Sequence, residues 1–271
     1  MSKQTYQTIV VKTADRTARV ELNRPKVHNA FNAVMIGELI QAFDHIEKDS
    51  AVRAAVLTGN GKSFCAGADL NWMREVIRYS FEQNMEESLQ IAELHHKIHT
   101  LPKPTIALVN GAAIGGGTGF LSACDIALAA EEAVFGLSEV KIGLVPAAIS
   151  PYVVKKIGES KAREYFLTGR RISARRACEI GLINHVYPGN ELESRGREVI
   201  DLLLSSGPAA LASCKELLYR VPRMSAEEAK RFTADMIARL RISAEGQEGM
   251  AAFLEKRQPK WVDDVKGKGD V

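Results

Sequence analysis

Long apolar runs are missing from the 271-residue sequence. None approaches the roughly 20 apolar residues that a membrane-spanning helix needs. Residues 1–5 show neither the apolar core of a signal peptide nor the Arg-rich amphipathic character of a transit peptide. We therefore expect a cytoplasmic protein without a membrane partner.

Cysteine is also scarce, with four residues in the whole chain. Cys65, Cys124, Cys178 and Cys214 lie far apart and never occur at C-x-x-C spacing. This pattern predicts buried, reduced thiols in a reducing compartment, and it predicts neither a disulfide framework nor a metal site.

A strong charge of either sign is absent as well. The 36 basic and 33 acidic residues give a net charge of +3, spread along the chain. The densest basic segment, residues 170–176, fits a solvated helix face better than a nucleic-acid patch, which would need stronger clustering. We predict no nucleic-acid partner, whereas a small anionic ligand would suit the slightly basic surface.

The order of apolar segments predicts an α/β protein. Residues 9–11 and 18–22 flank a turn and predict a β-hairpin, and a helical apolar stripe follows from about Asn32. From about residue 50 to 145, strand, loop, strand and helix recur, which indicates a coil of similar units. The dinucleotide fingerprint G-x-G-x-x-G is absent, so a nucleotide-binding sheet is not predicted.

The last third of the chain has a helical pattern, with breaks near residues 207–208 and 221–222. Helices that follow a finished α/β core commonly pack against a neighbouring subunit. We divide the chain into a core of residues 1–200 and a C-terminal helical region of residues 201–271.

Two stretches of small residues follow predicted strands. Residues 112–119 contain four glycines after the apolar run 106–109, and residues 65–70 follow the run 54–57. Free N–H groups in such loops favour negative charge on a ligand. Close packing of helix on strand explains one glycine-rich turn equally well, but two such loops can place two N–H groups around one oxygen, as in an oxyanion hole.

A third segment, residues 137–143, sets the carboxylate of Glu139 in an otherwise apolar run. Burial raises the pKa of such a group and suits it to acid–base catalysis. The alternative is a solvated glutamate beside Lys141.

Together these segments resemble the enoyl-CoA hydratase/isomerase (crotonase) superfamily, and the likeness extends from residues 20–25 to residues 253–257. The resemblance implies a spiral of repeated ββα units with a C-terminal helical trimerisation region. It also implies an acyl-CoA thioester substrate, of which coenzyme A is a part, no separate cofactor, no metal, and a homotrimer or homohexamer.

Roles for single residues follow from the same resemblance. The N–H groups of Ala68 and Gly116 would hold the thioester oxygen, and Glu139 would be the acid/base. Trp72 would wall the acyl pocket or simply pack, and His28 would contribute its side chain or only its backbone. The remaining predicted CoA contacts are Lys26, Val27, Ala30, Ala66, Asp69 and Leu70, with Phe253 and Lys256 reaching CoA from a neighbouring subunit.

One position departs from the family pattern. Gly119 stands where hydratases of the family carry a first glutamate, so ordinary short-chain hydration is in doubt. Residues 66–73 and 137–151 look most like bacterial methylglutaconyl-CoA hydratases of leucine degradation, which implies a lyase of class EC 4.2.1. An enoyl-CoA isomerase working with Glu139 alone is the alternative, and a non-catalytic or RNA-binding member is an alternative of another class.

Two minor expectations complete the sequence analysis. Arg74, Arg78 and Lys141 are candidates to bind the distal carboxylate of such a substrate. His95, His96 and His99 lie on one predicted helix without an evident carboxylate partner, and a surface position is favoured over a metal site.

Overall fold

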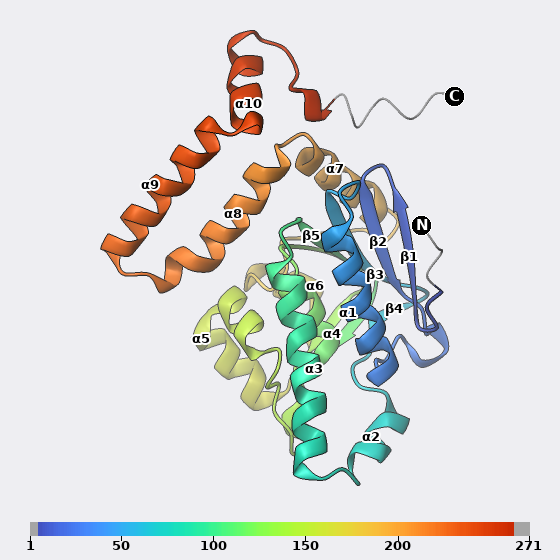
Figure 1. Cartoon of the computed structure of the whole chain (residues 1–271). Helices are drawn as coiled ribbons and strands as arrows, with labels where there is room; N and C mark the ends of the chain where they lie inside the picture. Colours follow the sequence, from blue (N-terminus) through green and yellow to red (C-terminus); the bar gives the residue numbers. More distant parts are fainter. Residues whose placement is uncertain (1–4, 263–271) are drawn as a thin grey trace.

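A six-stranded sheet forms the first layer of the computed structural model, which describes residues 5–262 (Figure 1). Its strands, in spatial order, are β1 (Ile9–Ala14), β2 (Thr17–Leu22), β3 (Ala54–Gly59), β5 (Thr105–Val109), β7 (Ile126–Ala130) and β10 (His185–Tyr187). Strands β1 and β2 form the predicted antiparallel hairpin. Asp15 and Arg16 make its two-residue turn with positive φ angles of 46° and 59°, which suits the right-handed twist of the strands. The other neighbours pair in parallel.

A second, four-stranded sheet lies beside the first. It consists of β4 (Ser63–Cys65), β6 (Ala112–Ile114), β8 (Val134–Gly136) and β9 (Ile172–Ser173), in that order. Each of β3, β5 and β7 in the first sheet is followed along the chain by a strand of the second sheet and then by helix. The predicted spiral of ββα units is confirmed.

Helices fill the connections and form the C-terminal third. Serines at positions 80 and 225 close capping boxes on α3 and α9, which satisfies N–H groups at both helix starts. The helices are η1 (Pro25–Val27), α1 (Ala33–Lys48), α2 (Leu70–Val76), α3 (Phe81–Thr100), α4 (Gly116–Ala123), η2 (Glu139–Ile142), α5 (Ser150–Thr168), α6 (Ala174–Glu179), α7 (Leu192–Leu204), α8 (Pro208–Arg220), η3 (Val221–Arg223), α9 (Ala226–Ile242) and α10 (Ala244–Leu254).

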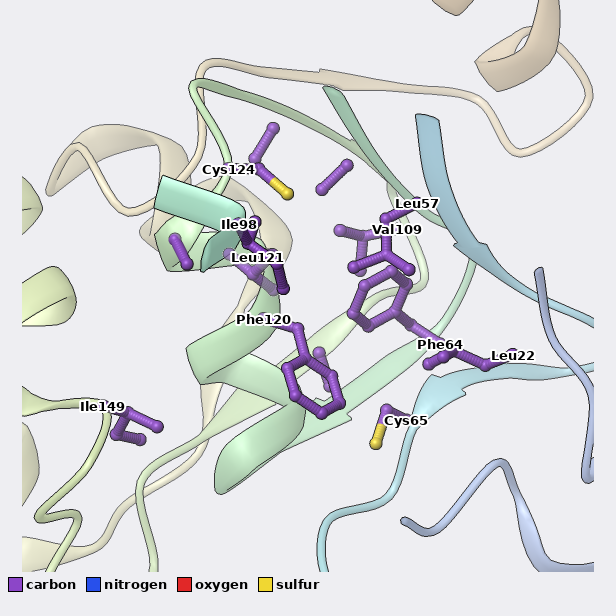
Figure 2. Close-up of a cluster of buried hydrophobic side chains, with 14 of the residues drawn as sticks. Leu22, Leu57, Phe64, Cys65, Ile98, Val109, Phe120, Leu121, Cys124 and Ile149 are labelled. Carbon is purple, nitrogen blue, oxygen red and sulfur yellow. The ribbon is translucent and has the colours of Figure 1, made fainter. Parts of the chain in front are cut away.

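Helix α4 lies at the centre of the core. Phe120 and Leu121 of α4 pack in one buried cluster with Phe64 and Leu57 of the strands and with Ile98 of α3 (Figure 2). Burying one such side chain contributes roughly 1.5–3 kcal/mol. The helix can lie this close to the second sheet because Gly117 has no side chain, and a Cβ there would collide with the Cys65 carbonyl of β4.

The C-terminal helices extend away from the sheets (Figure 1). Leu218, Ile242, Phe253 and Leu254 on these helices are each at least 70% exposed, which leaves a large apolar surface. The division at residue 200 stays a prediction, and residue 200 itself lies inside α7, whose Ile200 packs in a buried cluster with β3, β5 and β7. No helix among residues 5–262 is long and apolar enough to cross a membrane.

The prediction of a surface position for the histidines of α3 is wrong for His95. His96 is exposed and His99 is half-buried, but His95 is 0% exposed. Its ring stacks on Phe120 of α4 and on Tyr152 of α5 at centroid distances of 5.2 and 5.8 Å. His95 is therefore part of the buried face of α3, between Leu94 and Ile98.

Asn29 joins two loops of the core and gives a test of the fold. Its side chain is fully buried, donates to the carbonyls of Asn60 and Ser63 at 2.9 and 2.7 Å, and accepts from the N–H of Arg24. Its φ of 56° lies in the left-handed region that asparagine tolerates.

We expect Asn29→Ala to lower the free energy of unfolding by about 2–4 kcal/mol in urea titrations, because it leaves buried polar groups without partners. Asn60→Ala, which keeps the Asn60 carbonyl and removes only an exposed bond to Asn23, is the control and should cost less than about 1 kcal/mol. Equal losses of unfolding free energy in the two variants would contradict the role of the Asn29 side chain in joining the two loops.

Candidate active site

Glu139 begins η2, and only Leu137 and Ser138 separate it from the short strand β8. Its carboxylate points toward the start of α4, where Oε1 lies 3.0 Å from the position that a Cβ on Gly115 would take. Oε2 is buried and has no hydrogen-bond partner among the described residues. Burial raises the pKa of Glu139, and the bond from its own N–H offsets this only in part. The carboxylate is therefore half-buried against α4 and not in solvent beside Lys141.

Ala68 lies in the loop that follows β4. It forms an isolated parallel bridge with Phe31, in which the Phe31 N–H donates to Gly67 and the Phe31 carbonyl accepts from Asp69. In a parallel bridge the flanking residues make both bonds, so the N–H of Ala68 points away from Phe31. It is available to another acceptor.

Gly116 is the first residue of α4. The N–H groups in the first turn of a helix have no partner inside the helix, and the first bond here runs from the N–H of Gly119 to the carbonyl of Gly115 at 3.1 Å. A Cβ on Gly116 would lie 2.5 Å from the ring of Phe31, so only glycine fits beside this ring. The Gly116 N–H is the second available donor.

The two loops are in contact. Cys65 pairs with Ala113 where β4 meets β6. A Cβ on Gly67 would lie 3.1 Å from the Ile114 carbonyl, and one on Gly117 would lie 2.4 Å from the Cys65 carbonyl. The structure thus brings together the segments that carry Ala68, Gly116 and Glu139.

The predicted CoA segments also meet each other. An ion pair of 2.7 Å between Arg24 and Asp69 joins the loop before α1 to the loop before α2, and the N–H of Ala66 donates to the carbonyl of His28. Asp69 caps α2 through the N–H groups of Asn71 and Trp72. Burial raises the pKa of Asp69, but the combined effect of these donors and the Arg24 guanidinium is larger and opposite. The pKa of Asp69 is therefore lowered, and its carboxylate stays ionised.

The side chains in these segments differ in exposure. Lys26, Val27 and His28 are exposed around η1, Leu70 is 70% exposed, Ala66 is half-buried and Ala30 is buried. His28 has left-handed backbone and its Nδ1 lies 3.0 Å from Ser63 Oγ, so its ring braces the loop.

Trp72 is buried, donates through Nε1 to Glu87 at 2.6 Å, and packs edge-on against Phe31 at 5.6 Å. Because Phe31 also contacts the Gly116 position, Trp72 both packs in the core and supports the wall beside the predicted oxyanion site.

Phe253 and Lys256 are not brought to this site by their own chain. Phe253 lies at the end of α10, which is at the opposite end of the molecule from α2 (Figure 1). Both side chains are exposed. The expected contribution from a neighbouring subunit stays a prediction.

Sequence reasoning missed two side chains that shape the site. Phe31 covers the Gly116 position, and His95 lies against Gly119, where an added Cβ would be 2.5 Å from His95 Nε2 and 2.2 Å from Ile149 Cγ2. The only sequence signal for His95 was its place in the apolar stripe of Leu94 and Ile98.

The three residues predicted to bind the distal carboxylate of the substrate lie in two separate places. Arg74 and Arg78 line a surface cavity of about 490 Å³ along α2, together with Asn71, Glu75 and Tyr79. Lys141 is exposed and lies along Gly169 instead. No group of three His, Cys, Asp or Glu side chains that could hold a metal ion occurs within residues 5–262.

Comparison with known proteins agrees with this geometry. The sequence model of the enoyl-CoA hydratase/isomerase family matches residues 12–264. The chain is similar to a candidate enoyl-CoA hydratase of Thermus thermophilus (41% identity, 90% of this chain and 96% of that protein). It is also similar to a short-chain-enoyl-CoA hydratase of Clostridium acetobutylicum (32% identity, 92% and 95%). The crystal structure of an enoyl-CoA hydratase from Shewanella pealeana superposes with a TM-score of 0.91 at 42% identity, covering 94% of this chain and 96% of that one. The chain belongs to the enoyl-CoA hydratase/isomerase family and has the crotonase fold.

The raised pKa of Glu139 predicts a pH-dependent stability effect. A carboxyl group with a higher pKa in the folded than in the unfolded chain destabilises the fold as pH rises above the unfolded value of about 4.3. We expect Glu139→Gln to melt at or above the wild-type temperature at pH 8, with the difference vanishing toward pH 4.5. Scanning calorimetry across this range measures the effect. Asp235→Asn, at an exposed carboxylate paired with Arg239, is the control and should not stabilise at pH 8. A Glu139→Gln variant that is less stable than wild type at pH 8 would contradict the assigned burial.

Proposed function

We propose that the protein is a hydratase of 2-enoyl-CoA thioesters, with 3-methylglutaconyl-CoA as the substrate. The observation that carries the proposal is the half-buried carboxylate of Glu139, whose Oε2 is buried and has no partner among the described residues, facing the N-terminal turn of α4 beside two loops with available N–H groups. The names of the similar hydratases support the reaction type. The assignment of the methylglutaconyl acyl group is based on the sequence resemblance.

The reaction needs one carboxylate and two N–H donors. The oxygen of water bonds to C3 while one of its protons passes to Glu139, and the π electrons of the C2–C3 bond move into the thioester. The enolate oxygen accepts hydrogen bonds from Ala68 and Gly116, an arrangement that removes about 3–4 kcal/mol per donor from the barrier in comparable sites. Glu139, now protonated, returns the proton to C2, the carbonyl re-forms, and the net change is addition of H and OH.

Methylglutaconyl-CoA suits a site with one carboxylate. In the reverse direction its hydration product loses a tertiary hydroxyl, which leaves comparatively easily once the enolate has formed. Glu139 can then act as base and as proton donor on the same face of the substrate. The physiological process would be leucine degradation, and the reverse reaction is dehydration of 3-hydroxy-3-methylglutaryl-CoA.

The second candidate is an enoyl-CoA isomerase, favoured by Gly119 in place of a second glutamate. The carboxylate of Glu139 would then move a proton between C2 and C4, and no water would be consumed. RNA binding, the candidate of another class, is disfavoured because the net charge of +3 is dispersed.

The remaining expectations belong to the same proposal. Coenzyme A enters as part of the substrate, and no further cofactor is required. The exposed apolar surface of α8–α10 would be covered in a homotrimer or a homohexamer, which would also carry Phe253 and Lys256 to a neighbouring CoA site. We place the protein in the cytoplasm.

The first functional prediction concerns substrate choice. Purified protein is incubated with 3-methylglutaconyl-CoA, crotonyl-CoA and a 3-enoyl-CoA, and the products are separated by chromatography. We expect rapid hydration of the methylglutaconyl thioester and a 10²–10⁴-fold lower rate in Glu139→Gln, which loses proton transfer. Conversion of the 3-enoyl thioester alone would establish the isomerase.

A second functional prediction concerns the distal carboxylate. Since Arg74 and Arg78 line the cavity along α2, alanine at either position should raise KM for 3-methylglutaconyl-CoA about 10-fold and leave KM for crotonyl-CoA unchanged. Lys141→Ala is the matched control, because Lys141 lies outside the cavity. An equal change in KM for both substrates would show that the two arginines do not recognise the distal carboxylate.

A further inference from the structure

Gly119 has no room for a side chain. An added Cβ would lie 2.2 Å from Ile149 Cγ2 and 2.5 Å from His95 Nε2, both far inside van der Waals contact. Figure 2 shows Ile149 on the loop beside α4. His95, which belongs to α3, reaches the same position. A histidine nitrogen from another element thus occupies the space that a side chain at position 119 would fill.

The imidazole of His95 is held in one orientation. Its Nδ1 lies 2.7 Å from the carbonyl of Ile91, an acceptor, so Nδ1 carries the proton and Nε2 carries the lone pair. Phe120 and Tyr152 stack on the ring, each at an interplanar angle of 24°. Burial lowers the pKa of His95 to about 4, with the nearby carbonyls of Ile91 and Gly116 offsetting this in part. The ring is therefore neutral at physiological pH.

Two unpartnered polar atoms flank the same turn of α4. Oε2 of Glu139 and Nε2 of His95 are both buried and lack a hydrogen-bond partner among the described residues. Glu139 lies against Gly115 and His95 against Gly119, and the bond from the Gly119 N–H to the Gly115 carbonyl places these positions one turn apart. Both side chains therefore contact the start of α4 within one helical turn.

We propose that Nε2 of His95 binds the reacting water as the second polar group of the active site. This inference rests on the proposed hydration. One O–H of the water gives its proton to Glu139, and the other donates a hydrogen bond to Nε2 and stays on the oxygen as the product hydroxyl. His95 gains and loses no proton, so the balance of the reaction is unchanged. Its contribution is to aim the oxygen lone pair at C3.

The test measures two reactions separately: addition of water to the double bond, and exchange of the proton on C2. Exchange of the C2 proton of butyryl-CoA in D₂O needs Glu139 and the oxyanion donors but no attacking water. His95→Phe keeps a flat ring between Phe120 and Tyr152 and removes the acceptor. We expect it to lower kcat for hydration about 10²-fold and to keep C2 exchange within about 3-fold. His95→Gln, which retains an acceptor near Nε2, should recover most of the hydration rate.

Two further variants complete the experiment. His99→Phe makes the same change one turn later on α3, outside the site, and should leave both activities unchanged. Gly119→Ala pushes Nε2 and Ile149 aside without removing the imidazole, and it should reproduce the selective loss of hydration even if the His95 variants do not fold. Hydration within about 3-fold of wild type in His95→Phe and Gly119→Ala, or parallel loss of hydration and exchange, would overturn the role of His95. Absence of hydration in the wild type would instead overturn the proposed function.

Discussion

The close approach of α4 to the second sheet is the constraint on which the candidate site depends. Gly117 faces the Cys65 carbonyl at a distance that excludes a Cβ, and Gly116 faces the ring of Phe31 in the same way. With any larger residue the first turn of α4 would have to move away from β4, and the loop that carries Ala68 would separate from Gly116. The glycines are therefore needed for contact between backbone segments, and the availability of two N–H donors follows from that contact.

The same approach explains the environment of Glu139. A helix that begins in the core brings its unpaired N–H groups into a buried region, and η2 places a carboxylate there with one oxygen unpartnered. Desolvation raises the pKa of Glu139, while the positive end of α4 would favour its ionised form. These opposing influences suit the proton transfer that is proposed for Glu139.

The sequence predicted the parts of the fold that arise from local patterns. Periodicity located the hairpin, the strand–strand–helix repeat and the C-terminal helices. Residue composition located the two loops of small residues, and resemblance to a family suggested the acid/base role of Glu139. Position 119 marks where this reasoning stopped: the sequence shows a glycine where a glutamate is usual, but not what lies against it. His95 precedes Gly119 by 24 residues on a different helix, and only the packing of α3 on α4 brings Nε2 to that position. The place of His95 in the apolar stripe of Leu94 and Ile98 was a signal for burial, but only tertiary contacts show that its ring lies against Gly119.

Two unpartnered buried polar atoms in one place carry an energetic cost, since each such atom destabilises a fold by about 1–3 kcal/mol. Most buried polar groups in folded proteins have partners, and in this chain Asn29 and Thr118 show how thoroughly the surrounding structure satisfies them. Glu139 Oε2 and His95 Nε2 flank the turn that also presents the Gly116 N–H. Strain of this kind concentrates where a ligand supplies the missing partners. A water molecule supplies two O–H donors, one for the carboxylate and one for the imidazole nitrogen, while the oxygen of an acyl thioester supplies the acceptor for the backbone N–H. In this interpretation His95 can reach the site only because position 119 carries no side chain. Gly119 and His95 therefore depend on each other.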